Sequence, residues 1–153
     1  MKITKFLLSA FCALAFIACD DQPDIPAVTP PATAAAYIGE MVVGQNDGTS
    51  FTVEDLAVSY ELNDDNTMDI VLTQAQFAAA MPLKLDMTIP AADYTVDKGS
   101  YVISDSNIVP LALGGEFPMY TISSIEGTIT KETMTLEFMC GLFPVSYNGT
   151  IAK

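Results

Sequence analysis

Apolar residues recur at every second position from Tyr37 to the end of this 153-residue chain, in short runs that turn residues separate. Successive side chains of a β-strand point to opposite faces, so this spacing predicts strands with one apolar and one polar face. Residues 63–66, Asn-Asp-Asp-Asn, separate two such runs and predict a hairpin turn. The inward face of this hairpin is expected to carry Leu56, Val58, Tyr60 and Leu62 on one strand and Met68, Ile70 and Leu72 on the other.

Further strands are expected along the rest of the chain, which shows no sustained helical periodicity after Tyr37. Residues 73–81 are ambiguous because Ala and Gln favour helix, and we interpret them as a strand with an irregular end. Pro90 is expected to end strand 85–89, since proline has no N–H to donate to a neighbouring strand. A bulge near Ser123 and Ser124 is needed to keep the apolar residues on both sides of it facing inward. The other strands are expected at 37–43, 94–96, 101–103, 120–129, 134–140 and 145–151.

These patterns predict an all-β fold, a small antiparallel up-and-down barrel of about eight to ten strands. Closing the sheet leaves no open edge, and a two-sheet sandwich is the alternative. The outward positions are polar or charged, whereas the wall of a membrane-spanning barrel would be apolar there. Part of residues 107–118, which contain Pro and Gly, is expected to form a loop that folds over an opening. The outward residues are Ser59, Glu61, Asp69, Lys84, Asp86, Glu126 and Glu137.

Residues 1–18 combine a basic start with an apolar stretch, which is typical of an export signal that is removed. Ala18 directly precedes Cys19, and this ending resembles the bacterial lipobox, in which the cysteine is acylated and becomes the first residue. We therefore expect a lipoprotein signal peptide at 1–18 and lipid attachment, such as palmitate, at Cys19. An ordinary secretory signal or an uncleaved anchor is the alternative. Two or three acyl chains would give the stable membrane anchoring that one chain does not.

Residues 19–36 are expected to form a disordered tether, because Pro, Thr, Ala and Asp dominate it and offer no face to bury. The barrel domain would then occupy residues 37–153. The pair Asp20 and Asp21 resembles the export tags of some surface lipoproteins. The periplasmic leaflet and the cell surface therefore both remain open as locations of a lipid-anchored outer-membrane protein.

The formal net charge of −13 becomes about −15 once Lys2 and Lys5 leave with the signal. Such a surface repels phosphate groups, so we expect no nucleic-acid partner. The chain contains neither His nor Arg, which removes His-dependent catalysis and imidazole metal sites. We expect no enzyme, no catalytic residues, no metal and no cofactor. Cys140 is expected to be a buried thiol without a disulfide partner, because Cys12 leaves with the signal and Cys19 carries lipid.

Carboxylates are the remaining candidates for chemistry. Asp64 with Asp65, or Glu54 with Asp55, could act as acid and base or bind a hard cation such as Ca²⁺. Their positions in solvent-facing turns favour a structural role, because Asp stabilises turns. A hydrolase that depends on Asp64 or Asp65 is therefore the weakest of the functions considered.

Four groups of motifs in the barrel region also carry a family resemblance. They are Gly48-Thr49-Ser50-Phe51-Thr52; Met81-Pro82 with Leu85-Asp86-Met87-Thr88-Ile89-Pro90; Phe117-Pro118-Met119-Tyr120-Thr121-Ile122 with Gly127-Thr128-Ile129; and Cys140-Gly141-Leu142-Phe143-Pro144-Val145-Ser146-Tyr147-Asn148-Gly149. With these motifs the chain resembles the calycin-like β-barrel domain of lipoproteins from Bacteroidales-type bacteria. The resemblance implies a barrel fold and brings no catalytic residues with it. The wider calycin group includes lipocalins, but this chain has Gly39-Glu40-Met41 where their first strand has Gly-x-Trp.

The inward residues Met41, Met68, Met87 and Met134, with Tyr60, Phe138 and Tyr147, can fill a core or line an adaptable pocket. An eight-stranded barrel is just wide enough to be filled by its own side chains, which favours a core. Phe77, Met81, Phe117 and Tyr120 flank the least regular segments and are the predicted ligand-binding residues at a pocket mouth.

The predicted function is that of a non-enzymatic, lipid-anchored envelope lipoprotein whose barrel binds a small apolar ligand or a partner protein. The alternative is an accessory or inhibitory interaction module that acts through rim loops, with residues 107–118 as the contact, while the barrel itself is filled.

Overall fold

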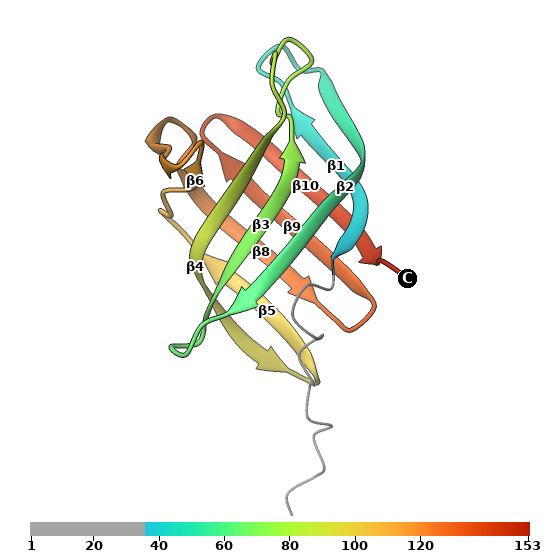
Figure 1. Ribbon diagram of the computed structural model, residues 1–153, viewed down its shortest axis with the longest axis vertical. Helices are drawn as coiled ribbons and strands as arrows, with labels where there is room; N and C mark the ends of the chain where they lie inside the picture. The colour runs from blue at the N-terminus through green and yellow to red at the C-terminus, as the bar shows by residue number, and fades with distance from the viewer. Residues whose placement is uncertain (1–35) are drawn as a thin grey trace, which may run out of the picture.

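The computed structural model describes residues 36–153, which form a rolled sheet (Figure 1). The predicted signal peptide, the lipid-attachment residue Cys19 and the tether up to residue 35 lie outside the described residues. The elements are β1 (Tyr37–Gly44), β2 (Ser50–Leu62), β3 (Thr67–Ala75), β4 (Leu85–Asp97), β5 (Ser100–Asp105), β6 (Leu111–Ala112), β7 (Gly115–Glu116), the 3₁₀ turn η1 (Pro118–Tyr120), β8 (Ile122–Ile129), β9 (Thr133–Cys140) and β10 (Phe143–Ile151). Within residues 36–153, no helix is long and apolar enough to span a bilayer.

Eight of these strands close into an antiparallel up-and-down barrel. Each pairs with the next long strand along the chain, and β10 returns to pair with β1. The short strands β6 and β7 form a hairpin that attaches to β4 beside the barrel wall. The predicted all-β barrel is confirmed, and the sandwich alternative is wrong, because the pairings run in a closed circle.

The two ends of the barrel differ in what they carry. At one end, the basal end, the described chain begins at Ala36, whose carbonyl accepts a hydrogen bond of 2.8 Å from the N–H of Ala152. The β2–β3, β4–β5 and β8–β9 turns lie at the same end. The opposite, distal end collects the β1–β2 turn, the β3–β4 loop, residues 106–121 and the β9–β10 turn (Figure 1).

The barrel interior is filled by its own side chains. The alternating residues of the eight strands form one buried apolar cluster that runs through the barrel. Most of the residues for which the sequence allowed either a core or a pocket lining lie in this cluster, at most 3% exposed: Met41, Met68, Met87, Met134, Phe138 and Tyr147. Tyr60 is only partly buried and packs against the cluster from the basal side.

The strand order agrees with the sequence patterns, but some strand boundaries do not. β4 continues through Pro90, which the sequence predicted as a strand end, because a bulge absorbs the proline. Ala91 adopts a positive φ of 50° there, and Asp69 on β3 accepts its N–H at 2.8 Å. β3 ends at Ala75 and residues 76–84 form a loop, so the strand predicted over 73–81 is wrong beyond its first three residues. The bulge predicted near Ser123 is confirmed by the register shift between Ile122 and Ser124.

Two facing glycines allow Tyr147 to join three strands. Gly39 on β1 pairs with Gly149 on β10. A Cβ at Gly39 would clash with the backbone carbonyl of Asn148, and a Cβ at Gly149 would displace the Tyr147 ring, so glycine fits best at both positions. The Tyr147 hydroxyl instead lies 2.8 Å from the carbonyl oxygen of Tyr37 and 3.2 Å from that of Leu56. It thereby ties β10 to β1 and to β2.

We expect Tyr147→Phe to lower the free energy of unfolding by about 1–2 kcal/mol, because a buried carbonyl loses its donor. Gly149→Ala should cost about 1–3 kcal/mol, because the Tyr147 ring must move to admit the methyl group. Urea unfolding followed by circular dichroism measures both changes. Thr150→Ser, exposed on the same strand, is the control and should stay within about 0.5 kcal/mol of wild type. A wild-type urea midpoint for Tyr147→Phe would contradict this account.

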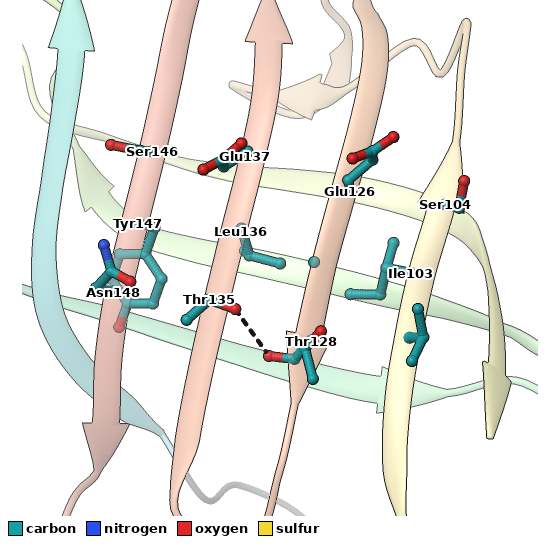
Figure 2. A pocket seen from close by; sticks show the side chains of 12 residues that line it. Ile103, Ser104, Glu126, Thr128, Thr135, Leu136, Glu137, Ser146, Tyr147 and Asn148 are labelled. Atoms are coloured by element: carbon teal, nitrogen blue, oxygen red, sulfur yellow. Dashed lines mark hydrogen bonds between the residues drawn. The ribbon is translucent and has the colours of Figure 1, made fainter. Parts of the chain in front are cut away.

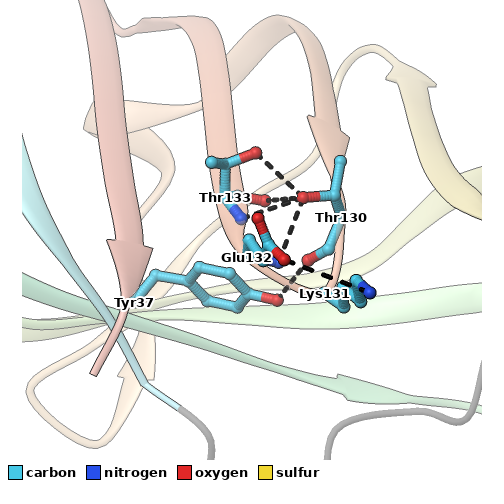
Figure 3. A network of polar contacts seen from close by, with 5 residues as sticks. All are labelled: Tyr37, Thr130, Lys131, Glu132 and Thr133. Atoms are coloured by element: carbon cyan, nitrogen blue, oxygen red, sulfur yellow. Dashed lines mark hydrogen bonds and ion pairs between the residues drawn. The ribbon is translucent and has the colours of Figure 1, made fainter. Parts of the chain in front are cut away.

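Tyr37 fastens the beginning of β1 to the β8–β9 turn (Figure 3). Its hydroxyl donates to the Thr130 carbonyl at 2.6 Å. Within the turn, the Thr130 hydroxyl accepts hydrogen bonds from the backbone N–H of Glu132 and of Thr133, at 3.1 and 2.9 Å. The ion pair between Lys131 and Glu132, at 4.0 Å, is exposed and contributes little.

Four tyrosine rings pack together at the basal end. The ring centroids of Tyr37 and Tyr60 are 6.4 Å apart, those of Tyr60 and Tyr101 are 5.8 Å apart, and those of Tyr101 and Tyr94 are 5.2 Å apart. The buried Tyr60 hydroxyl has no hydrogen-bond partner among the described residues. Burial, followed by the nearby tyrosine hydroxyls, raises the pKa of Tyr60. Burial also raises the pKa of Tyr147, so both residues hold their protons at pH values where an exposed tyrosine releases its own.

We expect the stability of the fold to fall as the pH rises above about 10, the pKa of an exposed tyrosine. Below that pH both states are protonated and the full stability is present. Above it the unfolded chain releases protons that the folded chain retains, which favours unfolding. Urea midpoints between about pH 7 and pH 11 test this expectation. A midpoint that stays constant or increases over the alkaline part of this range would contradict it.

Candidate functional site

Four aromatic rings form a stacked layer across the distal end of the barrel, which we call the aromatic plug. Tyr120 lies at its centre, with its ring 5.1 Å from that of Phe117 and nearly parallel to it, at 7°. The rings of Phe77 and Phe143 lie 6.1 and 6.5 Å from Tyr120 on its other sides. Phe77 belongs to the β3–β4 loop, Phe143 begins β10, Phe117 directly precedes η1 and Tyr120 ends it, so the plug joins three separate segments. It packs directly on the barrel core.

Polar contacts fix the loops that carry the plug. Gln45, in the β1–β2 turn, donates through Nε2 to the carbonyl of Phe77 at 3.0 Å. The N–H of Gly141, in the β9–β10 turn, donates to the carbonyl of Thr121 at 3.0 Å. Gly141 has φ of 63°, and an added Cβ would lie 2.9 Å from the carbonyl oxygen of Met119, so the two segments touch through backbone. All four distal connections are therefore held in one arrangement.

The structure brings together the four residues predicted to line a pocket mouth. Phe77, Phe117 and Tyr120 stack in the plug, and the Met81 sulfur accepts the N–H of Phe77 at 3.5 Å. They meet as a closed layer on top of the core, so their role in ligand binding stays a prediction. Tyr120 lies in η1, whereas the sequence predicted it at the beginning of a strand. The sequence prediction missed Phe143, which stands at a strand boundary and gave no separate signal.

Cys140 lies beneath the plug as a buried thiol, which confirms its predicted burial. Its Sγ lies 3.8 Å from the carbonyl oxygen of Tyr120. Burial raises the pKa of the Cys140 thiol to about 12, so the thiol is not ionised at neutral pH. Cys140 therefore contributes packing at this end of the barrel.

Four large apolar side chains are more than 60% exposed on the loops and turns of the distal end, and we call them the distal rim; Leu111, on β6, is 40% exposed. Their exposed fractions are 64% for Leu83, 74% for Leu113, 78% for Met119 and 75% for Leu142. Each comes from a loop or turn at the distal end, whereas the basal end exposes only Val96, at 55%, among the large apolar residues described. Apolar residues gathered on one end of a small domain typically mark a contact surface.

Leu113 combines its exposure with an unfavourable backbone. It occupies the first central position of the two-residue turn between β6 and β7, with φ of 53°, and Gly114 follows with φ of 85°. Such turns favour Asn, Asp or Gly, because other side chains crowd the backbone at positive φ. A left-handed residue other than Gly costs about 1–2 kcal/mol. The fold gains no burial from this leucine in return.

A groove of about 610 Å³ separates the tip of this hairpin from the beginning of β4. Lys84 and Asp86 lie on its β4 side, and Leu111 to Gly115 form the other side. One Asp86 oxygen accepts hydrogen bonds from the backbone and side-chain N–H groups of Gln74, at 2.8 and 3.3 Å. The groove thus lies beside Leu113 and is open to a side chain from outside.

A second hollow, of about 440 Å³, lies on the outer wall across β5, β8, β9 and β10 (Figure 2). Glu126 and Glu137 stand directly opposite each other on neighbouring strands, and Ser104 and Ser146 extend the row on either side. Like charges in such a pair repel each other and destabilise the sheet slightly. This wall is therefore acidic and presents acceptors to a cationic group.

The carboxylates predicted as candidates for chemistry, Asp64 with Asp65 and Glu54 with Asp55, do not meet in a common site. Asp65 accepts hydrogen bonds from the hydroxyl and N–H of Thr67, at 2.6 and 3.3 Å, and these bonds lower the pKa of Asp65. This is the turn-stabilising role that the sequence favoured for it. Glu54 and Asp55 lie in β2, where Asp55 has φ of 54°, at the bulge between β1 and β2. In the described part of the chain, no three His, Cys, Asp or Glu side chains gather as a metal site.

Comparison with known proteins supports the fold alone. No protein-family model and no curated protein matches the chain. Its structure is similar to that of a putative outer membrane protein from Bacteroides fragilis, with a TM-score of 0.50 and 17% sequence identity. The match covers 76% of this chain and 50% of the other, so the chain spans about half the length of that protein.

We expect Met119→Ser and Leu142→Ser to leave the free energy of unfolding within about 0.5 kcal/mol of wild type, because both side chains are exposed. Tyr120→Ala should lower it by about 2 kcal/mol, because its ring stacks against three others. Urea unfolding distinguishes the two classes of variant. If the serine variants lose as much stability as Tyr120→Ala, the distal rim is part of the core and not a free contact surface.

Proposed function

We propose that this protein is a non-enzymatic envelope lipoprotein that binds a partner protein through its distal rim. The observation that carries this proposal is the concentration of exposed Leu83, Leu113, Met119 and Leu142 at the end of the barrel opposite Ala36. The barrel would serve as a rigid support for this surface.

The filled interior favours a partner protein over a small apolar ligand. The core cluster occupies the barrel from the basal tyrosines to the aromatic plug. A ligand inside would have to displace side chains such as Met41, Met68 or Tyr147, which are at most 1% exposed. Opening a packed core costs free energy, whereas a contact on the outer surface does not require it, so we favour an external contact.

The position of Ala36 supports a contact made away from the membrane. If Cys19 carries lipid, as the lipobox-like sequence indicates, the chain rises from the bilayer and joins the barrel at its basal end. The distal rim then lies at the end of the barrel opposite the attachment of the tether, where another envelope protein can reach it. The likeness to the putative outer membrane protein of Bacteroides fragilis is compatible with this location.

The residue types support a role without catalysis. The chain has no His or Arg, and the pKa of its buried Cys140 thiol is raised away from the neutral range. Asp65 is engaged in its own turn. Binding through complementary shape and apolar contact requires neither His nor Arg nor a reactive thiol.

Site-specific photocrosslinking in intact cells tests this function. A photoreactive amino acid at Leu142 of the full-length lipoprotein should give a discrete protein adduct, because this position stands on the distal rim. The same amino acid at Val96, exposed at the basal end, is the matched control and should give none. Equal adducts at both positions, or none at Leu142, would contradict the proposal.

The lipid attachment at Cys19 is tested in the same cells with the variant Cys19→Ala. This variant lacks the acylated thiol, so we expect it to leave the membrane fraction and to lose the Leu142 adduct as its local concentration falls. Membrane association that persists in Cys19→Ala would show that the lipid attachment is wrong.

A further inference from the structure

The hairpin of β6 and β7 offers one residue that fits the role of an anchor in the contact. Leu113 stands at its tip with a positive φ of 53° and an exposed fraction of 74%. The positive φ and the exposure of an apolar side chain both lower the stability of this chain. Asn or Gly at that position would adopt the same φ at lower cost and would expose no large apolar side chain. A leucine there is useful only where something outside the chain covers it.

The same chain contains a matched turn at the opposite end of the barrel. Lys98 and Gly99 join β4 to β5 with φ values of 47° and 83°, nearly those of Leu113 and Gly114. At this basal turn the left-handed position carries a charged, solvated side chain. The two turns share their backbone angles, but one carries Lys98 where the other carries Leu113. The turn conformation therefore does not require a leucine at the distal tip.

The surroundings of Leu113 indicate what it meets. The groove beside it, bounded by Lys84 and Asp86, leaves room for side chains of a partner to lie against the hairpin. Glu116, exposed on β7, pairs with Leu111 at the base of the same hairpin. Asp86, in the groove, and Glu116, on the hairpin, therefore give this tip acidic neighbours.

Charge and position together favour a protein over a lipid surface as the occupant. The chain has 19 acidic residues against 6 basic ones, so a complementary surface is basic. Lys84 is the only basic residue in the described distal loops. The described chain begins at Ala36, at the end of the barrel opposite Leu113.

We propose that Leu113 is the anchor residue of the distal rim, inserting into an apolar pocket of an envelope protein whose pocket is bordered by Lys or Arg side chains. This inference rests on the proposed function and names the contact residue and the chemistry of the partner. Glu116, on the same hairpin, faces the basic border, and Leu83, Met119 and Leu142 complete the apolar contact at the distal end.

The test compares Leu113→Asn with Lys98→Asn in the full-length lipoprotein that carries the photoreactive amino acid at Leu142. Both substitutions place a preferred residue in the same kind of turn, so both should raise the urea midpoint of the protein. Leu113→Asn should reduce the adduct at least about tenfold, whereas Lys98→Asn should leave it unchanged. The higher urea midpoint shows that a lost adduct does not come from misfolding.

Two further readouts identify the partner chemistry. The adduct yield should fall as salt increases, and the crosslinked peptide of the partner should contain Lys or Arg next to apolar residues. The unlipidated Cys19→Ala protein should not bind vesicles of zwitterionic phosphatidylethanolamine. Vesicle binding that Leu113→Asn abolishes would replace the protein partner with a lipid surface and overturn the proposal.

The outcomes separate this inference from the proposed function. If wild-type protein gives no adduct at Leu142, the proposed function is wrong, and so is the role of Leu113 as its anchor residue. If the adduct forms and Leu113→Asn leaves it at the wild-type yield, the distal contact stands and only the role of Leu113 is wrong.

Discussion

Closure of eight strands around a packed interior is the constraint on which the rest of this structure depends. A barrel of this size is just wide enough for its own side chains, so each inward residue must fit its neighbours across the axis. Tyr147 shows how tight the fit is, because its hydroxyl reaches β1 and β2 only where Gly39 and Gly149 leave room. Because the interior is occupied by the core cluster, we propose binding on the outer surface instead.

Aromatic side chains pack at both ends of the barrel, but the two ends differ in the residues that they expose to solvent. Tyrosines close the basal end beside the place where the described chain begins, and the aromatic plug closes the distal end. Among the large apolar residues described, only Val96 is exposed at the basal end, whereas Leu83, Leu113, Met119 and Leu142 are exposed at the distal end. This asymmetry, on an otherwise regular barrel, is what makes one end a candidate contact surface.

Much of the fold could be predicted from alternation and turn residues, because both act over a few neighbouring positions. The continuation of β4 through Pro90 could not, since it depends on Asp69 from another strand accepting the N–H of Ala91. Phe77, Phe117 and Tyr120 were predicted from their place beside irregular segments, and the structure brings them together. The exposed Leu113 and Leu142 could not be singled out, because sequence alone does not tell an exposed apolar loop residue from a buried one.

The central claim is that the barrel is filled and that recognition takes place on its outside. Native mass spectrometry of the mature protein, extracted from its own membranes, tests this claim most directly. The account predicts a single mass, equal to the polypeptide and its lipid anchor, with no small molecule released on unfolding. A stoichiometric apolar molecule that appears only when the protein unfolds would contradict it.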